Sequence, residues 1–378
     1  MMTMKKNTEA FMALVRAGLW EKEARLSLFG DIDMTEVAKL AAEQSVVGLV
    51  AAGIEHVKDA NIPQIHALDI AGSTLQIEQV NTTMNRFVAE LLNKMSDAGI
   101  KAILMKGQGI AQCYERSLWR ASGDVDLLMD EENYDKAKRL LLPLASSRED
   151  EVEKRKHLGL TINGWTVELH GTLRGSYFKR VDRELDKLQQ ETCRNNKVRI
   201  WQNGSCRISL PAPDEDVIIV FTHIHQHFTQ GGIGLRQICD WCRLLWRYRE
   251  ELDLGLLEER LDRMGLMTEW KVFAAFAVDY LGMAVEAMPL YRSSKILQWK
   301  ARRLLSFVLE TGNFGHNRDN SYRREVEFLN AKLISTKRNL NDGLKQFVIF
   351  PMDSMKVLRI SLMSGVMRTV KEIMCKKS

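Results

Sequence analysis

Two aspartates in the middle of the chain have the spacing of a metal-binding pair. They lie in the segment Gly123-Asp124-Val125-Asp126-Leu127, at the start of an apolar run. Alternate side chains of a β-strand share a face, so both carboxylates point one way and the apolar side chains point the other. Adjacent carboxylates repel each other unless a cation lies between them. The pair therefore predicts a site for Mg²⁺ or Mn²⁺, with a strand entry carrying solvated acids as the alternative.

A third acid is expected from a hairpin further along the chain. Asn163-Gly164 separates two β-rich runs, 157–162 and 165–170, and is a strong signal for a type I′ turn. Glu168 then lies on the second strand, with its side chain on the same face as that of His170. If this strand lies beside the aspartate strand, three carboxylates converge and suit a metal-assisted phosphoryl displacement. An exposed strand residue is the alternative for Glu168.

Glycines and basic residues that precede the aspartates suit a phosphate. Gly107 and Gly109 follow a short apolar run at 100–105, where a strand is expected to give way to a helix. Glycine at such a transition lets backbone N–H groups approach a phosphate. Lys106 and Arg120 supply the positive charge that a triphosphate requires.

Both basic residues also have simpler interpretations. Lys106 could be a surface lysine at the end of a strand, and Arg120 could form an ion pair with Asp124 or Glu115.

Four further residues are candidates for the substrate side of the cleft. His170 follows Glu168 by two positions and is expected to be structural or to hydrogen-bond a substrate. The other three lie in the expected helical region beyond residue 211: His227, Arg236 and Asp240.

The order of these motifs resembles the nucleotidyltransferase superfamily of polymerase-β-like enzymes. The chain is similar in particular to a bacterial branch of uncharacterised nucleotidyltransferase-like proteins. The motifs that carry the resemblance are Lys106-Gly107, Arg120-Ala121-Ser122-Gly123-Asp124-Val125-Asp126 and Glu168-Leu169-His170, with His223, His227 and Asp240 echoing a later helix of that branch. The chain departs from the superfamily pattern by having Lys106-Gly107 in place of Gly-Ser and a glutamate as the third acid.

The resemblance implies an enzyme that transfers a nucleotidyl group from an NTP to an acceptor such as a small molecule, a sugar or a protein. Asp124, Asp126 and Glu168 would hold Mg²⁺ or Mn²⁺, and Glu168 could also deprotonate an acceptor hydroxyl. A second set of residues would bind the triphosphate: Lys106, Gly107, Gly109, Arg120 and Gly123. A nucleotide-binding or regulatory protein without turnover, and a phosphotransferase, are the alternatives.

These residues require a small sheet between helical regions. Helical periodicity over the first hundred residues, with Thr35 as an expected N-cap, gives way to strand patterns and returns after Pro211-Ala212-Pro213. A second hairpin is expected around Asn203-Gly204. We therefore predict an α+β fold, with a small mixed β-sheet core flanked by N-terminal and C-terminal helical regions. The expected boundaries are 1–98 for the N-terminal helices, 99–210 for the nucleotidyltransferase-like core and 211–378 for the C-terminal helical domain.

Composition excludes several classes of protein. The 378 residues carry a formal charge of +5 and are 45% hydrophobic, which argues against disorder and gives no strong nucleic-acid signal. Six cysteines are too few for a disulfide scaffold, and no signal peptide or transmembrane segment is apparent, so a cytoplasmic protein with free thiols is expected. Basic and apolar residues mix over 356–377, as in an amphipathic helix that touches a membrane or an anionic partner, or in a packed helix with a solvated face.

Overall fold

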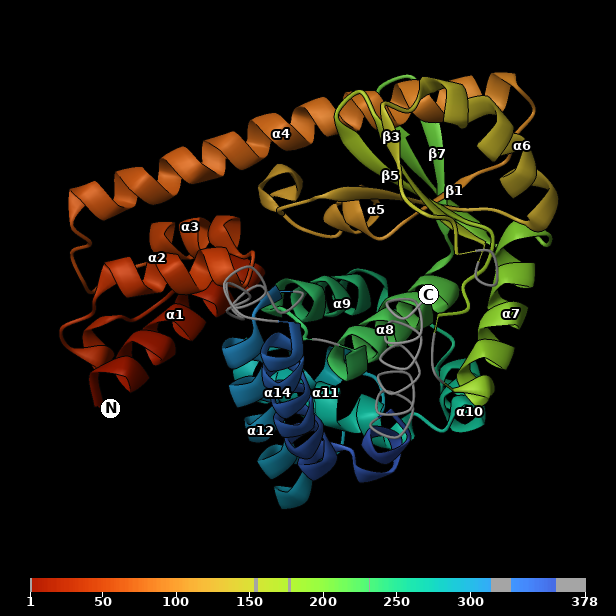
Figure 1. Ribbon diagram of the computed structural model, residues 1–378. Helices are drawn as coiled ribbons and strands as arrows, with labels where there is room; N and C mark the ends of the chain where they lie inside the picture. The colour runs from red at the N-terminus through yellow and green to blue at the C-terminus, as the bar shows by residue number, and fades with distance from the viewer. Residues whose placement is uncertain (1, 153–155, 176–177, 231, 314–327, 358–378) are drawn as a thin grey trace.

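The computed structural model describes residues 2–152, 156–175, 178–230, 232–313 and 328–357. Figure 1 shows a small sheet region that lies among helices from both ends of the chain. The N-terminal helices are α1 (Met2–Trp20), α2 (Met34–Glu43), α3 (Val47–Glu55) and α4 (Gln64–Asp97). The middle region contains β1 (Ile103–Met105), α5 (Gly107–Ala111), β2 (Asp124–Leu128), α6 (Glu131–Leu141), β3 (Ser147–Arg148), β4 (His157–Ile162), β5 (Trp165–His170), α7 (Lys179–Cys193), β6 (Val198–Asn203) and β7 (Cys206–Pro211). The C-terminal helices are α8 (Pro213–Gln230), α9 (Leu235–Tyr248), α10 (Leu254–Met264), α11 (Met267–Leu281), α12 (Lys295–Thr311) and α14 (Phe328–Ile349).

Five strands form one mixed sheet in the order β1-β2-β5-β4-β3, which confirms the predicted α+β fold. Strands β2 and β5 are parallel neighbours, whereas the other neighbouring strands pair antiparallel. Strands β6 and β7 form a separate antiparallel hairpin. The parallel pair places the aspartate strand directly beside the glutamate strand.

Both Asn-Gly turns close hairpins, as predicted. Between β4 and β5, Asn163 and Gly164 have φ values of 52° and 83°, which are the positive values that a type I′ turn requires. The two-residue loop fixes the register, so His157 at the far end of β4 lies opposite His170. Gly204, between β6 and β7, likewise has a positive φ of 60°.

One face of the sheet is apolar and is covered by helices. Val125 and Leu127 of β2, with Val167 and Leu169 of β5, lie in a core that also contains side chains of α4 and α6. Because side chains alternate along a strand, the polar residues between them emerge on the opposite face. That face lines a cavity whose other wall includes α8.

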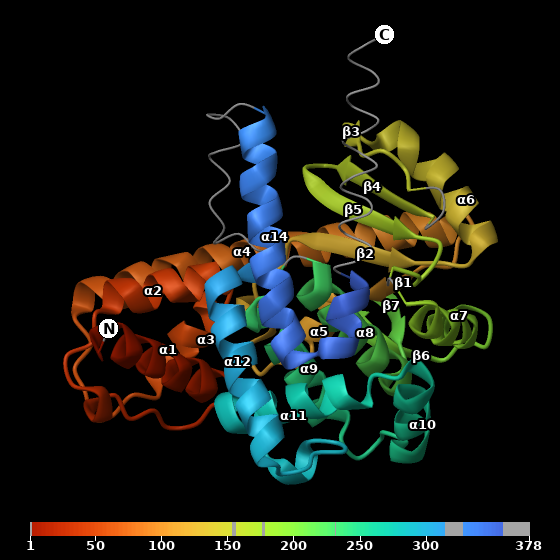
Figure 2. The same cartoon turned by 60° about the horizontal axis from the view of Figure 1, so that its bottom comes forward.

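The N-terminal and C-terminal helices share a second hydrophobic core. Phe11 of α1 belongs to the same buried cluster as Trp241 of α9 and Phe273 of α11. The indole Nε1 of Trp20 donates a 2.6 Å hydrogen bond to the carbonyl of Leu281, which ties the end of α1 to the end of α11. Helices α12 and α14 contact each other, and Figure 2 shows them side by side in the middle of the view.

Helix α4 joins the two parts of the molecule. It runs across the top of Figure 1, from the N-terminal helices to the sheet. Met84, Leu91 and Met95 on its C-terminal half are buried in the core of the middle region. The C-terminal half of α4 therefore packs with the sheet. The domain boundaries 1–98, 99–210 and 211–378 stay a prediction.

Two glycines allow α1 and α3 to lie backbone to backbone. A Cβ atom on Gly53 would lie 2.1 Å from the carbonyl oxygen of Leu14, and one on Gly18 would lie 1.9 Å from that of Leu49. Only a residue without a side chain permits such an approach.

Helix α2 is capped by a different residue from the one predicted. The prediction of Thr35 as N-cap is wrong, because Asp33 precedes the helix. The Asp33 carboxylate accepts hydrogen bonds from the backbone N–H groups of Thr35 and Glu36. Aspartate and threonine are both favourable N-caps, so the sequence alone does not separate the two positions.

Within the described ranges, no helix combines the length and apolar character that are needed to cross a bilayer. The cysteines in these ranges are all free thiols: Cys113, Cys193, Cys206, Cys239 and Cys242. The basic segment 356–377 falls, apart from its first two residues, outside the described residues.

Candidate active site

Strands β2 and β5 bring the three predicted acids to one face of the sheet. The parallel register places Asp126 opposite Glu168, and Asp124 lies two residues earlier on the same strand. Val125 and Leu127 anchor β2 in the apolar core, so the carboxylates are held by a buried strand. The metal-binding role of the three acids stays a prediction.

The Asp126 carboxylate has two cationic neighbours. Its Oδ1 atom lies 3.0 Å from Nζ of Lys106 and 2.7 Å from Nε2 of His170. Burial would raise the pKa of Asp126, but Lys106 and His170 hold this pKa below its usual value. Burial would also lower the pKa of His170, but the hydrogen bonds to Asp126 and Glu168 raise it. These contacts keep the Asp126 carboxylate ionised.

Lys106 is held in this position by an unusual backbone turn. Its φ and ψ are 52° and −143°, and Gly107 follows with a φ of 38°. Positive φ costs a non-glycine residue about 1 kcal/mol or more, and such residues gather at functional sites. The turn joins β1 directly to α5 and places the Lys106 ammonium beside Asp126. Lys106 is therefore not an ordinary surface lysine, since only 17% of its side chain is exposed.

Glu168 accepts contacts from two histidines through one oxygen atom. Its Oε2 atom lies 3.1 Å from Nε2 of His157 and 3.4 Å from Nε2 of His170. The hydrogen bonds from His157 and His170 hold the pKa of Glu168 far below its usual value. The Glu168 carboxylate is therefore ionised and is a poor proton acceptor.

Asp124 differs from the other two acids because its charge is not matched by a direct contact. Among the residues that the structure describes, none hydrogen-bonds or ion-pairs with its carboxylate. Burial, and then the neighbouring Asp126 carboxylate, raise the pKa of Asp124 above its usual value. Asp124 is thus the acid that gains most from a cation.

The oxygen atoms of the three acids fit a hard divalent cation. The hydrogen bonds of Asp126 all reach Oδ1 and those of Glu168 all reach Oε2, so Oδ2 and Oε1 have no hydrogen-bond partner in the described part of the chain. Both oxygens of Asp124 are also open. Carboxylate oxygens of this kind are the ligands that Mg²⁺ and Mn²⁺ favour.

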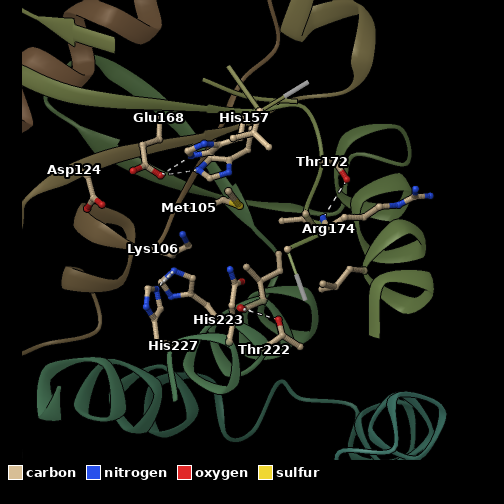
Figure 3. A pocket seen from close by; sticks show the side chains of 17 residues that line it. Met105, Lys106, Asp124, His157, Glu168, Thr172, Arg174, Thr222, His223 and His227 are labelled. Carbon is tan, nitrogen blue, oxygen red and sulfur yellow. Dashed lines mark hydrogen bonds and ion pairs between the residues drawn. The ribbon is translucent and has the colours of Figure 1, made fainter. Parts of the chain in front are cut away.

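A cavity of about 280 Å³ lies between this face of the sheet and α8. Figure 3 shows Asp124, Glu168 and His157 on one side and His223 and His227 on the other, with Lys106 between them. His223 and His227 are one helical turn apart, and their Nε2 atoms lie 2.9 Å from each other. Burial, and then the charge of Lys106, lower the pKa of both, that of His227 to about 4. Both imidazoles are therefore neutral at neutral pH.

A second, smaller cavity of about 40 Å³ continues beneath Lys106 and Asp124, and it brings Arg120, Arg236 and Asp240 together. Arg120 donates to both oxygens of Asp240, Nε to Oδ1 at 2.9 Å and Nη2 to Oδ2 at 2.7 Å. The alternative ion pair with Asp124 or Glu115 is thus wrong. Arg236 donates a 2.7 Å hydrogen bond to the carbonyl of Ala121, while its buried Nε atom has no hydrogen-bond partner in the described part of the chain.

A family described as uncharacterised nucleotidyltransferases matches residues 30–282, which is more than half of the chain. The chain belongs to this family. The match spans the sheet, the three acids and both cavities, and membership supports a transferase enzyme. No curated protein and no solved structure matches the chain.

Two further glycines of this nucleotidyltransferase family member were predicted to bind the triphosphate. A Cβ atom on Gly109 would lie 2.8 Å from Cδ2 of Leu210, so this glycine permits close packing of α5 against β7. Gly123 precedes β2, and a Cβ there would meet no atom within 4 Å apart from its chain neighbours. Their part in triphosphate binding, like that of Gly107, stays a prediction.

Among the histidines that line the cavity of this nucleotidyltransferase, His157 was not predicted, and His223 was named only as part of the family resemblance. His157 could have been found, because a two-residue turn after Ile162 fixes the register that pairs His157 with His170. The four-residue spacing of His223 and His227 also places both side chains on one face of a helix, which would have supported a site role for His223.

Proposed function

We propose that this protein transfers a nucleotidyl group from an NTP to an acceptor hydroxyl, with Mg²⁺ or Mn²⁺ held by Asp124, Asp126 and Glu168. One observation carries the proposal: parallel strands set these carboxylates side by side with open oxygen atoms, Asp124 and Glu168 at the larger cavity and Asp126 at the smaller one. A cation bound there would neutralise charge on the triphosphate and on the reacting phosphate.

The charge in direct contact with the site supports a cation. The carboxylates of Asp124, Asp126 and Glu168 lie together on one face of the sheet, and one lysine ammonium, that of Lys106, contacts them through Asp126. A divalent cation would reduce the repulsion between these carboxylates.

Lys106 and Arg236 are the cations best placed to contact phosphate oxygens. Lys106 lines both cavities, and Arg236 lines the smaller one beside Asp124. Arg120 acts differently, because Asp240 occupies its guanidinium. We assign it the role of a positioning residue, which holds the loop before β2 and thereby Asp124.

Glu168 serves as a ligand rather than as the base that activates the acceptor. Its strongly lowered pKa favours the carboxylate form, whereas a general base works best with a pKa near the operating pH. Catalysis would then come from positioning and charge stabilisation.

The test follows a label from the α-phosphate of each NTP in the presence of Mg²⁺ and cell extract. We expect label on an acceptor together with pyrophosphate release. The double variant Asp124→Asn/Asp126→Asn should lose this transfer, while Glu132→Gln, at an exposed position on α6, should keep it.

The products separate the proposal from other activities on the same site. Release of ADP with transfer of the γ-phosphoryl group would identify a phosphotransferase. NTP binding without pyrophosphate release would identify a binding protein. Equal labelling by the double variant and the wild type would refute the metal site.

A further inference from the structure

We propose that His157, Glu168 and His170 form a binding site for a transition-metal dication such as Zn²⁺. This site uses imidazole nitrogens and Oε2 of Glu168, so its donor set differs from the carboxylate oxygens assigned to Mg²⁺ or Mn²⁺. Imidazole with one carboxylate is a donor set that suits Zn²⁺ and poorly suits Mg²⁺. The inference does not rest on nucleotidyl transfer.

The donor atoms have the separations of metal ligands. Oε2 of Glu168 lies 3.1 Å from Nε2 of His157 and 3.4 Å from Nε2 of His170. One possible ligand atom from each of the three side chains lies within 4.8 Å of the other two. Ligands about 2.0–2.1 Å from a tetrahedral Zn²⁺ lie roughly 3.3 Å apart. Small side-chain rotations would therefore complete the coordination.

All three proposed ligands lie on strands rather than on loops. His157 and His170 lie directly opposite each other in the β4–β5 pair, and their ring centroids are 4.8 Å apart. Glu168 lies two residues before His170, on the same face of β5. Gly159 is the residue opposite Glu168, and the side chain of Glu149 fills the place that a side chain at position 159 would take.

A metal ion bound to His170 Nε2 would replace the contact of this atom with Oδ1 of Asp126, which measures 2.7 Å. Asp126 keeps its contact with Lys106 at 3.0 Å, so its buried carboxylate is not left unpaired.

The site is also reachable. The exposed fractions of the side chains are 28% for His157, 27% for Glu168 and 15% for His170, and all three line the large cavity. Three protein ligands beside a cavity leave a coordination position for water or for a substrate atom.

The primary test uses metal-free full-length protein, titrated with Zn²⁺ by calorimetry and with Co²⁺ by visible absorption. We expect one equivalent of Zn²⁺, and Co²⁺ bands of nitrogen and oxygen coordination. His157→Gln should weaken Zn²⁺ binding by about ten-fold or more. His66→Gln, on the first turn of α4, should leave it unchanged and serves as the matched control.

His157→Gln is preferred to His170→Gln because His170 contacts the buried Asp126, and its loss could disturb folding. Circular dichroism and thermal unfolding check that each variant is folded. Zn²⁺ binding that is absent from the wild type, or equal in wild type and His157→Gln, would overturn the proposal. Thiolate charge-transfer bands with Co²⁺ would also overturn it, because they would place the metal on cysteine.

Asp124→Asn separates this inference from the proposed function. This variant should lose label transfer from the NTP but keep one equivalent of Zn²⁺. If no protein transfers label and Zn²⁺ still binds through His157, the proposed function fails and the inference stands.

Discussion

Arg120 and Asp240 form a bidentate ion pair between the loop before β2 and helix α9. The two hydrogen bonds measure 2.9 and 2.7 Å, and both side chains are 6% exposed. The hydroxyl of Tyr114 also donates to Asp240, at 2.8 Å. Because Ser122 accepts a further hydrogen bond from Arg120, this pair fixes the loop that leads to Asp124.

The first prediction concerns this ion pair. Arg120→Ala should lower the free energy of unfolding by about 3–5 kcal/mol, because it leaves the buried Asp240 carboxylate without its cation. Urea unfolding monitored by fluorescence measures the change. Lys136→Ala removes an exposed ion pair with Glu132 and should change the free energy by less than about 1 kcal/mol. Equal effects of the two variants would contradict the buried-pair interpretation.

The second prediction concerns Asp124, whose charge is unfavourable in the metal-free protein. Asp124→Asn should raise the free energy of unfolding by about 1 kcal/mol at neutral pH, because it removes a partly buried carboxylate beside Asp126. Mg²⁺ at about 100 times its Kd should raise the free energy of unfolding of the wild type by about 2.7 kcal/mol. The same Mg²⁺ concentration should raise that of the variant much less. Thermal unfolding with EDTA or with Mg²⁺ measures both effects. A destabilised Asp124→Asn protein would show that the carboxylate has a structural partner.

The third prediction concerns the pH dependence of stability at His227. The pKa of this residue is about 4, below the ordinary value of 6.5, because of burial and of the charge of Lys106. Between these values the unfolded chain takes up a proton that the folded protein does not. The free energy of unfolding should therefore fall as the pH falls, by about 1 kcal/mol from about pH 7.5 to about pH 5.5.

His227→Gln should remove this part of the pH dependence, whereas His66→Gln should retain it. Urea unfolding at several pH values measures the difference between the two variants. The same slope in both variants would mean that His227 titrates normally in the folded protein.

The fourth prediction concerns the contact between α1 and α3. Gly53→Ala should lower the free energy of unfolding by about 2 kcal/mol or more, because its Cβ would meet the Leu14 carbonyl oxygen. Gly72→Ala is the matched control, because nothing lies within 4 Å of a Cβ at that position of α4. There alanine should stabilise the helix by up to about 1 kcal/mol. The thermal unfolding temperature should thus fall for Gly53→Ala and rise for Gly72→Ala. A stabilised Gly53→Ala protein would contradict the close packing of α1 and α3.

Local chemistry made much of the sheet predictable. The Asn163-Gly164 turn determines its own backbone conformation, so it gave the hairpin and the position of Glu168 on β5. The alternation of apolar and acidic residues around Asp124 gave β2 and the face that its acids share. The sequence did not predict that β2 and β5 are neighbours; the convergence of the three acids was expected only if they were. Strand pairing depends on contacts between residues distant in sequence, which local patterns do not reveal.

Contacts between distant segments explain what the sequence left undecided. Arg120 lies 120 positions before Asp240, and no local pattern distinguishes this partner from the nearer acids Asp124 and Glu115. The same applies to the cavity wall on α8, because helical spacing pairs His223 with His227 but does not show what they face. The cap at Asp33 was missed for a different reason, since two good capping residues lie two positions apart.

The core that α1 shares with α9 and α11 has a consequence for synthesis of the protein. Trp20 and Leu281, which are joined by a hydrogen bond, are 261 positions apart. A ribosome therefore releases α1 long before the helices that cover its apolar side chains exist. We expect the N-terminal helices to reach their native packing late, after translation has passed α11, and to be candidates for chaperone binding until then.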